Sequence, residues 1–239
     1  MSHTNSVEII PAILPKNYED MKNKIALVRG LVPLVQIDIC DGSFVKNTTW
    51  PFSTGGNEDY NLQKILREEE GMPFWEDIDF ELDLMVSDAV ENFDIYTKLG
   101  PKRLIFHIEA QEIEGNLEDF KDFLEGIDVY IRDSIEIGVA INTTTDISKI
   151  FPIVNSVDFV QCMGIGQIGF QGQDFDERVL EQIKKLKEKF ADLIISVDGG
   201  VTLNTAPALV SAGASRLVAG SAIFNTDDII ERIEEFRNL

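Results

Sequence analysis

Two polar side chains stand inside an otherwise apolar segment, Leu34 to Cys40. Gln36 and Asp38 are two positions apart, so in a β-strand both point to the same face. A carboxylate can serve as an acid, a base or a metal ligand, whereas an unpaired carboxylate in a core is costly. Either this face lines a functional site, or a donor elsewhere in the chain pairs with Asp38.

Polar residues also end or interrupt several other short apolar segments. In a parallel barrel the carboxyl ends of the strands meet at one face, where active sites lie. A single acid in such a place could simply cap the next helix. Several acids, a histidine and an asparagine at the same rim predict a functional site instead; these residues are Asp38, Asp41, Asp83, His107, Glu109, Asn142 and Asp198. His107 is as consistent with a hydrogen-bonded rim residue as with a catalyst.

Glycines follow the last two apolar segments, as Gly199-Gly200 and Gly220-Ser221. Barrels often bind phosphate in these two loops through backbone N–H groups, which glycine lets an anion approach closely. The alternative is that these glycines only form tight turns. A third glycine-rich stretch, Gly164 to Gln173, follows the sixth apolar segment and is long enough to close over a ligand.

The elements that must position these residues alternate regularly along the chain. Eight short apolar segments are separated by stretches with helical periodicity, of which Glu177 to Phe190 is the clearest, and this alternation is typical of repeated βα units. Asn17, Asp88, Asp146 and Asn204 are the expected helix starts. The expected strands are Glu8 to Leu14, Leu34 to Cys40, Phe80 to Val86, Arg103 to Glu109, Glu136 to Asn142, Asp158 to Met163, Leu193 to Asp198 and Arg216 to Ala219.

Eight such units predict an α/β protein with a closed (β/α)8 TIM barrel, and residues 1–239 are expected to form a single domain. A doubly wound open sheet is the alternative. The chain lacks the Gly-x-Gly-x-x-Gly turn after its first strand that many such sheets carry.

Composition limits the partners and the compartment. The formal net charge is -21, from 21 basic and 42 acidic residues, which argues against nucleic acid and anionic membranes as partners. No apolar run approaches the roughly 20 residues that span a bilayer, and the start of the chain does not resemble a signal peptide. The two cysteines, Cys40 and Cys162, lie in different expected strands, so we expect no disulfide and a cytoplasmic location.

Taken together, motifs from the first expected strand to the last resemble the ribulose-phosphate 3-epimerase family. As a set they are specific, although each alone is weak. They are Pro11-Ala12-Ile13-Leu14, Gln36 to Asn47, Leu84-Met85, Phe106 to Ala110, Gly138 to Asn142, Gly169-Phe170-Gln171-Gly172-Gln173, Val197-Asp198-Gly199-Gly200, Ala212-Gly213-Ala214 and Val218 to Phe224.

The resemblance implies a ribulose-phosphate-binding barrel that inverts C3 of a phosphorylated ketose through an enediolate, in the pentose phosphate pathway. It implies that Asp38 and Asp198 are the acid/base pair on opposite sides of the reacting carbon, and that a divalent metal stabilises the enediolate oxygens. The substrate and its phosphate would contact Met85, Asn142, Gly169, Phe170, Gln171, Gly172, Gly199, Gly200, Gly220 and Ser221. Barrels of this family commonly assemble, so a homo-oligomer is expected.

The chain departs from the family pattern at the metal site. Gln36 and Asp83 stand where the family has its two metal-binding histidines, Ala12 replaces a substrate-contacting serine, and the segment at about 48–79 is enlarged. The resulting ligand set, Asp38, Asp83, Asp198 and Gln36, contains only oxygen donors, which favours Mg²⁺ or Mn²⁺ over Zn²⁺ or Fe²⁺. The alternatives are a metal-free site with one protonated aspartate, and an Asp83 that pairs with a neighbouring base.

Three functions follow from these residues. The first is an epimerase acting on a phosphorylated ketose such as ribulose 5-phosphate. The second is a phosphosugar-binding barrel that has lost catalysis together with its histidines. Keeping both Asp38 and Asp198 favours the enzyme, because a binding protein needs only the phosphate loops. The third is a decarboxylase or aldolase related to hexulose-phosphate synthase, which the absence of an Asp-x-Lys arrangement around Asp83 disfavours.

Overall fold

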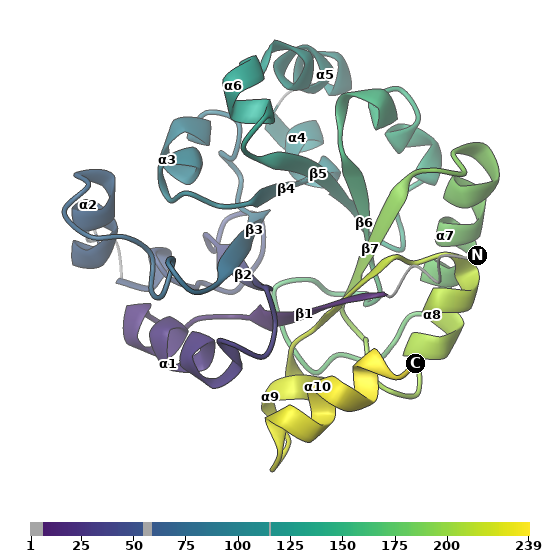
Figure 1. The fold of residues 1–239 in the computed structure, drawn as a ribbon. Helices are drawn as coiled ribbons and strands as arrows, with labels where there is room; N and C mark the ends of the chain where they lie inside the picture. Colours follow the sequence, from purple (N-terminus) through teal and green to yellow (C-terminus); the bar gives the residue numbers. More distant parts are fainter. Residues whose placement is uncertain (1–6, 55–58, 115) are drawn as a thin grey trace.

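The computed structural model describes residues 7–54, 59–114 and 116–239, in which eight parallel strands form one closed barrel. The strands follow one another in chain order and the last pairs with the first (Figure 1), which confirms the (β/α)8 TIM barrel. They are β1 (Glu8–Ile13), β2 (Leu34–Cys40), β3 (Asp79–Met85), β4 (Arg103–His107), β5 (Glu136–Ile141), β6 (Phe159–Met163), β7 (Ile194–Asp198) and β8 (Arg216–Ala219).

Helices surround the barrel and cover the outer faces of its strands (Figure 1). The α-helices are α1 (Tyr18–Val28), α2 (Tyr60–Leu66), α3 (Phe93–Lys98), α4 (Ile108–Glu114), α5 (Leu117–Gly126), α6 (Val129–Arg132), α7 (Arg178–Lys189), α8 (Ala206–Ala212), α9 (Ser221–Phe224) and α10 (Ile229–Arg237). Short 3₁₀ turns are η1 (Phe52–Thr54), η2 (Ile147–Ile150) and η3 (Val154–Ser156). None of the described helices is both long and apolar enough to cross a membrane.

The strands match the sequence expectation closely because each is buried on both faces, as parallel barrel strands are. All seven residues of β2 are buried. The clearest difference is in β4, which ends at His107, so Glu109 lies in the first turn of α4 rather than at a strand end. In the register between β2 and β3, Asp38 lies opposite Asp83.

Two of the four expected helix starts are confirmed and two are wrong. The Asn17 side chain accepts from the Asp20 N–H at the start of α1, and Asp146 caps η2. However, α3 begins five residues after Asp88, at Phe93, and α8 begins at Ala206, two residues after Asn204. Capping side chains are common in turns that do not start a helix, so an isolated Asp or Asn predicts a helix start poorly.

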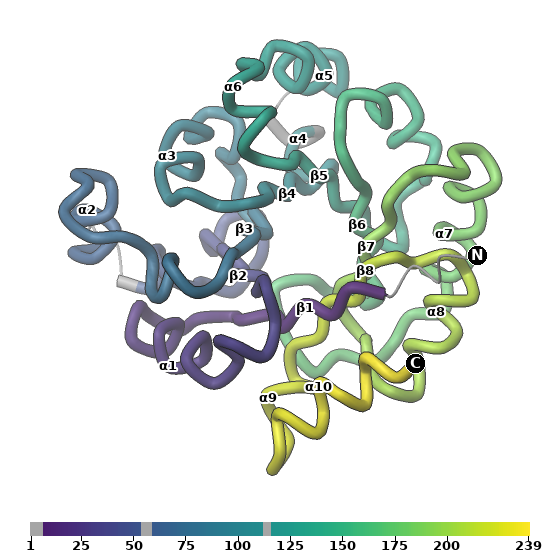
Figure 2. The backbone as a smooth tube through the Cα atoms, viewed as in Figure 1, coloured from purple at the N-terminus to yellow at the C-terminus, as the bar shows by residue number. Residues whose placement is uncertain are grey.

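The segment between β2 and β3 carries α2 outside the ring of barrel helices (Figures 1 and 2). The expected enlarged loop at about 48–79 includes it, although residues 55–58 lie outside the described residues. Asp59 caps α2 and also accepts from Trp50 Nε1 at 2.9 Å. Trp50 is fully buried, so this contact ties the segment to the barrel, whereas Trp75 is 60% exposed.

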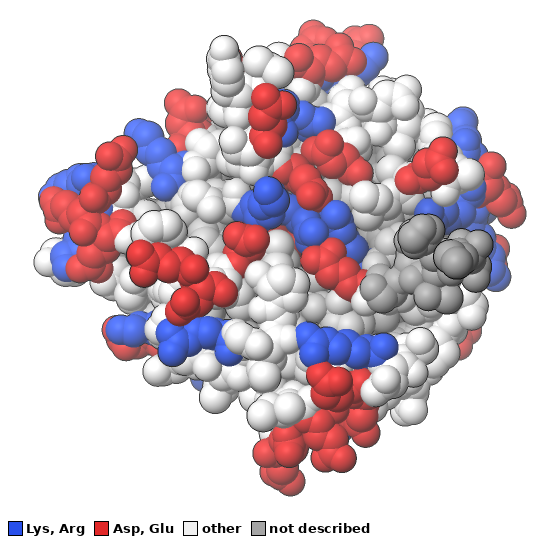
Figure 3. Space-filling view, in the orientation of Figure 1, with Lys and Arg blue, Asp and Glu red and all other residues white. Residues whose placement is uncertain are grey.

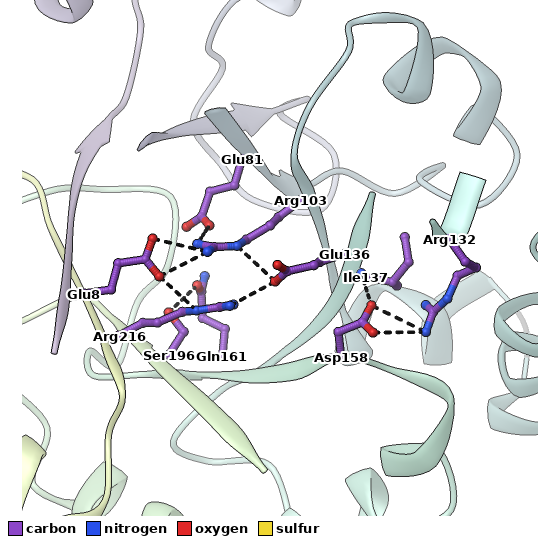
Figure 4. Close-up of polar contacts among 10 residues, drawn as sticks. All are labelled: Glu8, Glu81, Arg103, Arg132, Glu136, Ile137, Asp158, Gln161, Ser196 and Arg216. Carbon is purple, nitrogen blue, oxygen red and sulfur yellow. Dashed lines mark hydrogen bonds and ion pairs between the residues drawn. The ribbon is translucent and has the colours of Figure 1, made fainter. Parts of the chain in front are cut away.

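At the amino-terminal end of the strands, an ion-pair cluster closes the barrel (Figure 4). Arg103 pairs with Glu8, Glu81 and Glu136 at 3.0 to 3.1 Å, and Arg216 pairs with Glu8 and Glu136. On the molecular face drawn in Figure 3, acidic and basic side chains mix near the centre. The ion-pair cluster, which we call the barrel floor, is at the opposite end from the expected active site, so we assign it a structural role.

Candidate active site

Three aspartates from three strands meet inside the barrel. Asp38 on β2, Asp83 on β3 and Asp198 on β7 each offer one carboxylate oxygen, and these oxygens lie within 4.8 Å of one another. Their exposed fractions are 5%, 0% and 9%. Because the barrel closes between β8 and β1, the carboxyl end of β7 lies near those of β2 and β3. Residues that are far apart in the chain therefore form one cluster.

Gln36 joins two of these aspartates. Its side-chain Nε2 donates to Asp38 Oδ1 at 2.8 Å and to Asp198 Oδ2 at 2.9 Å. The side chain is fully buried, and its Oε1 has no hydrogen-bond partner among the described residues. In this structure the amide nitrogen, which cannot bind a cation, therefore faces the carboxylates.

Asp83 is held from the other side. His107 Nε2 lies 2.9 Å from Asp83 Oδ1, and Gln161 Nε2 donates to Asp83 Oδ2 at 3.3 Å. Ser196 Oγ in turn donates to Gln161 Oε1 at 3.2 Å, and Figure 4 shows this pair beside the barrel floor. Gln161 and Ser196 are not among the site residues predicted from the sequence. The signal that could have found them is the one that identified Gln36, a polar residue at an inward position of an apolar strand.

Burial and mutual repulsion change the proton affinity of this cluster. Burial, together with the charges of Asp198 and Asp83, raises the pKa of Asp38 well above its ordinary value. Burial and Asp83 raise the pKa of Asp198 to about 7, although the Gln36 hydrogen bond opposes this. Burial lowers the pKa of His107, but the charge and hydrogen bond of Asp83, together with the charges of Glu109 and Asp198, outweigh burial, so the net shift is upward. Without a cation, the cluster therefore holds at least one carboxyl proton near neutral pH.

A pocket of about 70 Å³ opens above the aspartates. Asp38 and Asp198 line it, whereas the buried Asp83 and Gln36 are not among its lining residues. Of the residues expected to contact substrate or phosphate, only Asn142 is not among those lining this pocket. Those that do line it are Met85, Gly169, Phe170, Gln171, Gly172, Gly199, Gly200, Gly220 and Ser221.

The glycines after β7 are required by the backbone. Gly199 and Gly200 have φ angles of 89° and 67°, in the left-handed region that side chains disfavour. A Cβ on Gly199 would lie 2.6 Å from Ile165, and one on Gly200 would lie 2.9 Å from the Gly164 carbonyl. The loop after β7 is thus packed against the glycine-rich loop after β6, and both line the same pocket.

The loop after β6 crosses the pocket and is held at two points. Asn47 Nδ2 donates to the Gly169 carbonyl at 2.8 Å, and Gln171 Nε2 donates to the Ala12 carbonyl at 3.0 Å. The Gln171 amide also packs against Gly220, where a Cβ would clash with Nε2. In this structure the loop Gly164 to Gln173 therefore lies over the pocket and is hydrogen-bonded to β1 and to the loop after β2.

Asn142 follows β5 behind the pocket. Glu109 Oε1 accepts from the Asn142 N–H at 2.8 Å and from Thr145 Oγ1, and Gln182 Nε2 donates to the Asn142 carbonyl at 2.9 Å. The Asn142 Oδ1 atom is buried and has no partner among the described residues. Glu109 thus holds the turn after β5.

The three aspartates fit a divalent cation. Mg²⁺ binds oxygen at about 2.0 to 2.1 Å, so opposite ligands around it are about 4 Å apart. The carboxylate oxygens of Asp38, Asp83 and Asp198 lie within 4.8 Å of one another and would close on such an ion with small shifts. An all-oxygen carboxylate set suits Mg²⁺ or Mn²⁺ better than a softer metal.

The sequence is similar to a known enzyme family. The model of the ribulose-phosphate 3 epimerase family matches residues 8–224. Ribulose-phosphate 3-epimerase from Bacillus subtilis (strain 168) is 29% identical over 239 residues, covering 97% of this chain and 98% of that protein. The cytoplasmic isoform of the same enzyme from Oryza sativa subsp. japonica is 27% identical, covering 99% and 96%.

Solved structures share the fold at lower identity. KGPDC from Streptococcus mutans is 15% identical with a TM-score of 0.65, covering 97% of this chain and 96% of that one. A 3-hexulose-6-phosphate synthase is 19% identical with a TM-score of 0.62, covering 98% of each chain. At these identities the likeness supports the barrel fold alone.

Proposed function

Because the chain belongs to the ribulose-phosphate 3 epimerase family, we propose that it inverts C3 of a phosphorylated ketose such as ribulose 5-phosphate. Relatives over nearly its whole length are epimerases, so the chain is an isomerase. The observation that carries the proposal is that Asp38 and Asp198 reach one pocket from β2 and β7. Two carboxyl groups on different walls are what inversion at one carbon needs.

The proposed reaction moves one proton off C3 and another onto its opposite face. One aspartate, as carboxylate, takes the C3 proton, and the electron pair of the broken C–H bond moves to the C2 carbonyl to give an enediolate. The other aspartate, as carboxylic acid, then donates its proton to C3 from the opposite side. In the reverse direction Asp38 and Asp198 exchange these tasks. A cluster that holds a proton near neutral pH is suited to this chemistry, because the pair must contain one acid and one base.

The phosphate is proposed to bind the backbone of the loops after β7 and β8, at Gly199, Gly200, Gly220 and Ser221. The closed loop above the pocket, with Gly169, Phe170, Gln171 and Gly172, would exclude water from the enediolate. Met85 would contact the sugar from β3. Asn142 is proposed as a substrate contact as well, although in this structure its side chain lies outside the pocket lining.

Asp38, Asp83 and Asp198 are proposed to hold Mg²⁺ or Mn²⁺. Such an ion would stabilise negative charge on the enediolate oxygens. The alternative is a metal-free site in which one aspartate of the cluster is protonated. A cytoplasmic location and a homo-oligomeric state complete the proposal, and the two buried free cysteines agree with a reducing compartment.

The second candidate is a phosphosugar-binding barrel without turnover. It is supported by the orientation of Gln36, whose nitrogen faces the carboxylates where the family has a metal-binding histidine. Both candidates predict phosphate binding, so only a measurement of turnover distinguishes them.

The test is proton exchange at C3. Chelator-treated protein is incubated with ribulose 5-phosphate in deuterated water, alone and with Mg²⁺, Mn²⁺ or Zn²⁺. We expect deuterium at C3 of the product, with Mg²⁺ or Mn²⁺ more effective than Zn²⁺. Absence of deuterium under every condition, with the sugar phosphate still bound, would favour the binding protein over the epimerase for this substrate.

A further inference from the structure

We propose that Gln36 opposes cation binding at the aspartate cluster, so that a divalent ion binds only by displacing the Gln36 amide from Asp38 and Asp198. This inference rests on the proposed metal site and assigns Gln36 a role contrary to that of a metal ligand. Gln36 becomes a positioning residue that holds the acid/base pair together when no ion is bound.

The geometry carries the inference. A single NH₂ group donates one hydrogen bond to Asp38 Oδ1 at 2.8 Å and one to Asp198 Oδ2 at 2.9 Å. Both distances are in the range of hydrogen bonds to charged acceptors. The amide thus bridges two carboxylates whose oxygens are close enough to share an ion. It places the positive end of its dipole toward the same two groups that would coordinate a cation.

An incoming cation therefore meets two costs. It must compete with two charge-assisted hydrogen bonds to buried groups, each of which is stronger than a hydrogen bond between neutral groups. It would also face N–H hydrogens with partial positive charge instead of an oxygen lone pair. At Asp83 the hydrogen-bond contacts come from His107 and Gln161, so Gln36 acts directly on Asp38 and Asp198 alone.

The competing arrangement is an amide turned over by half a rotation, which would present Oε1 to the ion. Nothing donates to Oε1 among the described residues, so the present orientation is fixed only by the two carboxylates. A turn would have to break both bonds inside a fully buried site. Moreover, an amide oxygen is neutral, so its bond to the ion would offset the loss of the two hydrogen bonds less than a bond from a carboxylate would. We therefore infer competition rather than ligation.

The test measures the affinity for Mg²⁺ alone, without substrate. The full-length, chelator-treated protein is titrated by calorimetry at about pH 8.5, where protons compete least for the carboxylates. Gln36→Met and Gln36→Leu remove the donors and keep a similar volume. We expect both to bind Mg²⁺ at least about tenfold more tightly than the wild type, the factor expected when a charge-assisted hydrogen bond no longer competes. Gln63→Met, the same exchange on α2 outside the barrel, should leave the affinity unchanged.

Two further measurements locate the effect. Asp83→Asn should weaken Mg²⁺ binding in every background, which places the ion at the aspartate cluster. In the wild type, saturating Mg²⁺ should shift the Gln36 side-chain amide resonances in ¹⁵N NMR spectra, because both hydrogen bonds break. The NMR measurement needs no variant, so a folding defect in the substituted proteins does not decide the result.

Weaker Mg²⁺ binding in Gln36→Met and Gln36→Leu would overturn the inference and make Gln36 a ligand through Oε1. Unchanged affinity in both variants, no binding in any variant, or unmoved amide resonances at saturation would also overturn it. These outcomes are independent of the proposed reaction, because no substrate is present. A failed deuterium exchange would count against the epimerase and leave the role of Gln36 intact.

Discussion

His107 Nε2 lies 2.9 Å from Asp83 Oδ1, and both side chains are fully buried. The sequence alone left two roles open for Asp83, a metal ligand and the partner of a neighbouring base. The structure pairs it with His107 and still leaves it within reach of the other two aspartates. The two roles are therefore compatible, and His107 is the residue that orients Asp83.

Removing His107 should destabilise the protein when no metal is bound. Among the described residues, His107→Leu leaves the buried Asp83 with only the long hydrogen bond from Gln161. We therefore expect the free energy of unfolding to fall by about 3 kcal/mol in chelator at pH 7. Urea unfolding measures this. His107→Gln keeps a donor and should recover part of the loss. Equal stability of His107→Leu and the wild type would show that Asp83 does not depend on this contact.

Asp198→Asn should abolish turnover while leaving phosphate binding intact. The amide cannot exchange a proton with C3, and loss of an acid/base group lowers rates by about 10²- to 10⁴-fold. Asp198 lies below the glycine loops, so the affinity for inorganic phosphate should not change. Asp192→Asn, at an exposed position before β7, is the control. If Asp198→Asn turned over as fast as the wild type, Asp198 would not be an acid/base group.

Gln171→Ala should loosen the loop over the pocket. It removes the hydrogen bond from Nε2 to the Ala12 carbonyl. The free energy of one ordinary hydrogen bond corresponds to about a three- to tenfold change in an equilibrium constant, here that of loop closure. We expect KM for the sugar phosphate to rise by that factor, with faster hydrogen exchange at residues 164–173. The exposed Gln167 of the same loop provides the control, Gln167→Ala. Unchanged exchange in Gln171→Ala would show that this contact does not hold the loop.

Arg103→Met should destabilise the barrel without a direct effect on chemistry. Arg103 pairs with Glu81, which is 1% exposed, and removal of one partner of a buried pair costs about 3 to 5 kcal/mol. The double variant Arg103→Met with Glu81→Leu removes both charges and should recover part of the loss. Thermal and urea unfolding measure stability, and kcat of the folded fraction should stay near the wild-type value.

Much of the fold could be predicted because its signal is local. The bounds of β2 and β8 agree with the sequence expectation, since each is a short, mainly apolar run followed by turn residues, Asp41-Gly42 and Gly220-Ser221. The closed barrel followed from eight such runs alternating with helical segments. A single domain over residues 1–239 stays a prediction. Helix starts failed at Asp88 and Asn204 because side-chain caps also occur in turns.

The site was predictable in part because some of its residues also give a local signal in the sequence. Asp38, Asp83 and Asp198 stand out as charges in apolar strands, but their partners depend on which strands become neighbours across the barrel. Gln161 reaches Asp83 from β6 across the barrel interior, at a separation of 78 positions in the chain. The orientation of the Gln36 amide depends on two carboxylates at once, and only the closed barrel brings Asp198 to it.

Asp176 should make stability depend on pH. The hydrogen bond from the Arg178 side chain, supported by Thr143 Oγ1 at 2.7 Å and the Arg178 N–H, lowers the pKa of Asp176 below its ordinary value of 3.8 despite partial burial. A lowered pKa means that the unfolded chain binds the proton more readily. The contribution is thus fully present above about pH 5 and is lost as the pH falls through the acid range.

We therefore expect Asp176→Asn to lower the free energy of unfolding by about 1 kcal/mol at pH 7, the scale of one hydrogen bond. The difference from the wild type should shrink as the pH falls from 5 to 3, because the wild-type carboxylate becomes protonated on unfolding. Urea titrations at pH 7, 5, 4 and 3 measure it. Asp174→Asn removes the same charge at an exposed position two residues away and should show no such trend. A constant difference for Asp176→Asn at all four pH values would mean that the Asp176 contacts do not depend on its charge.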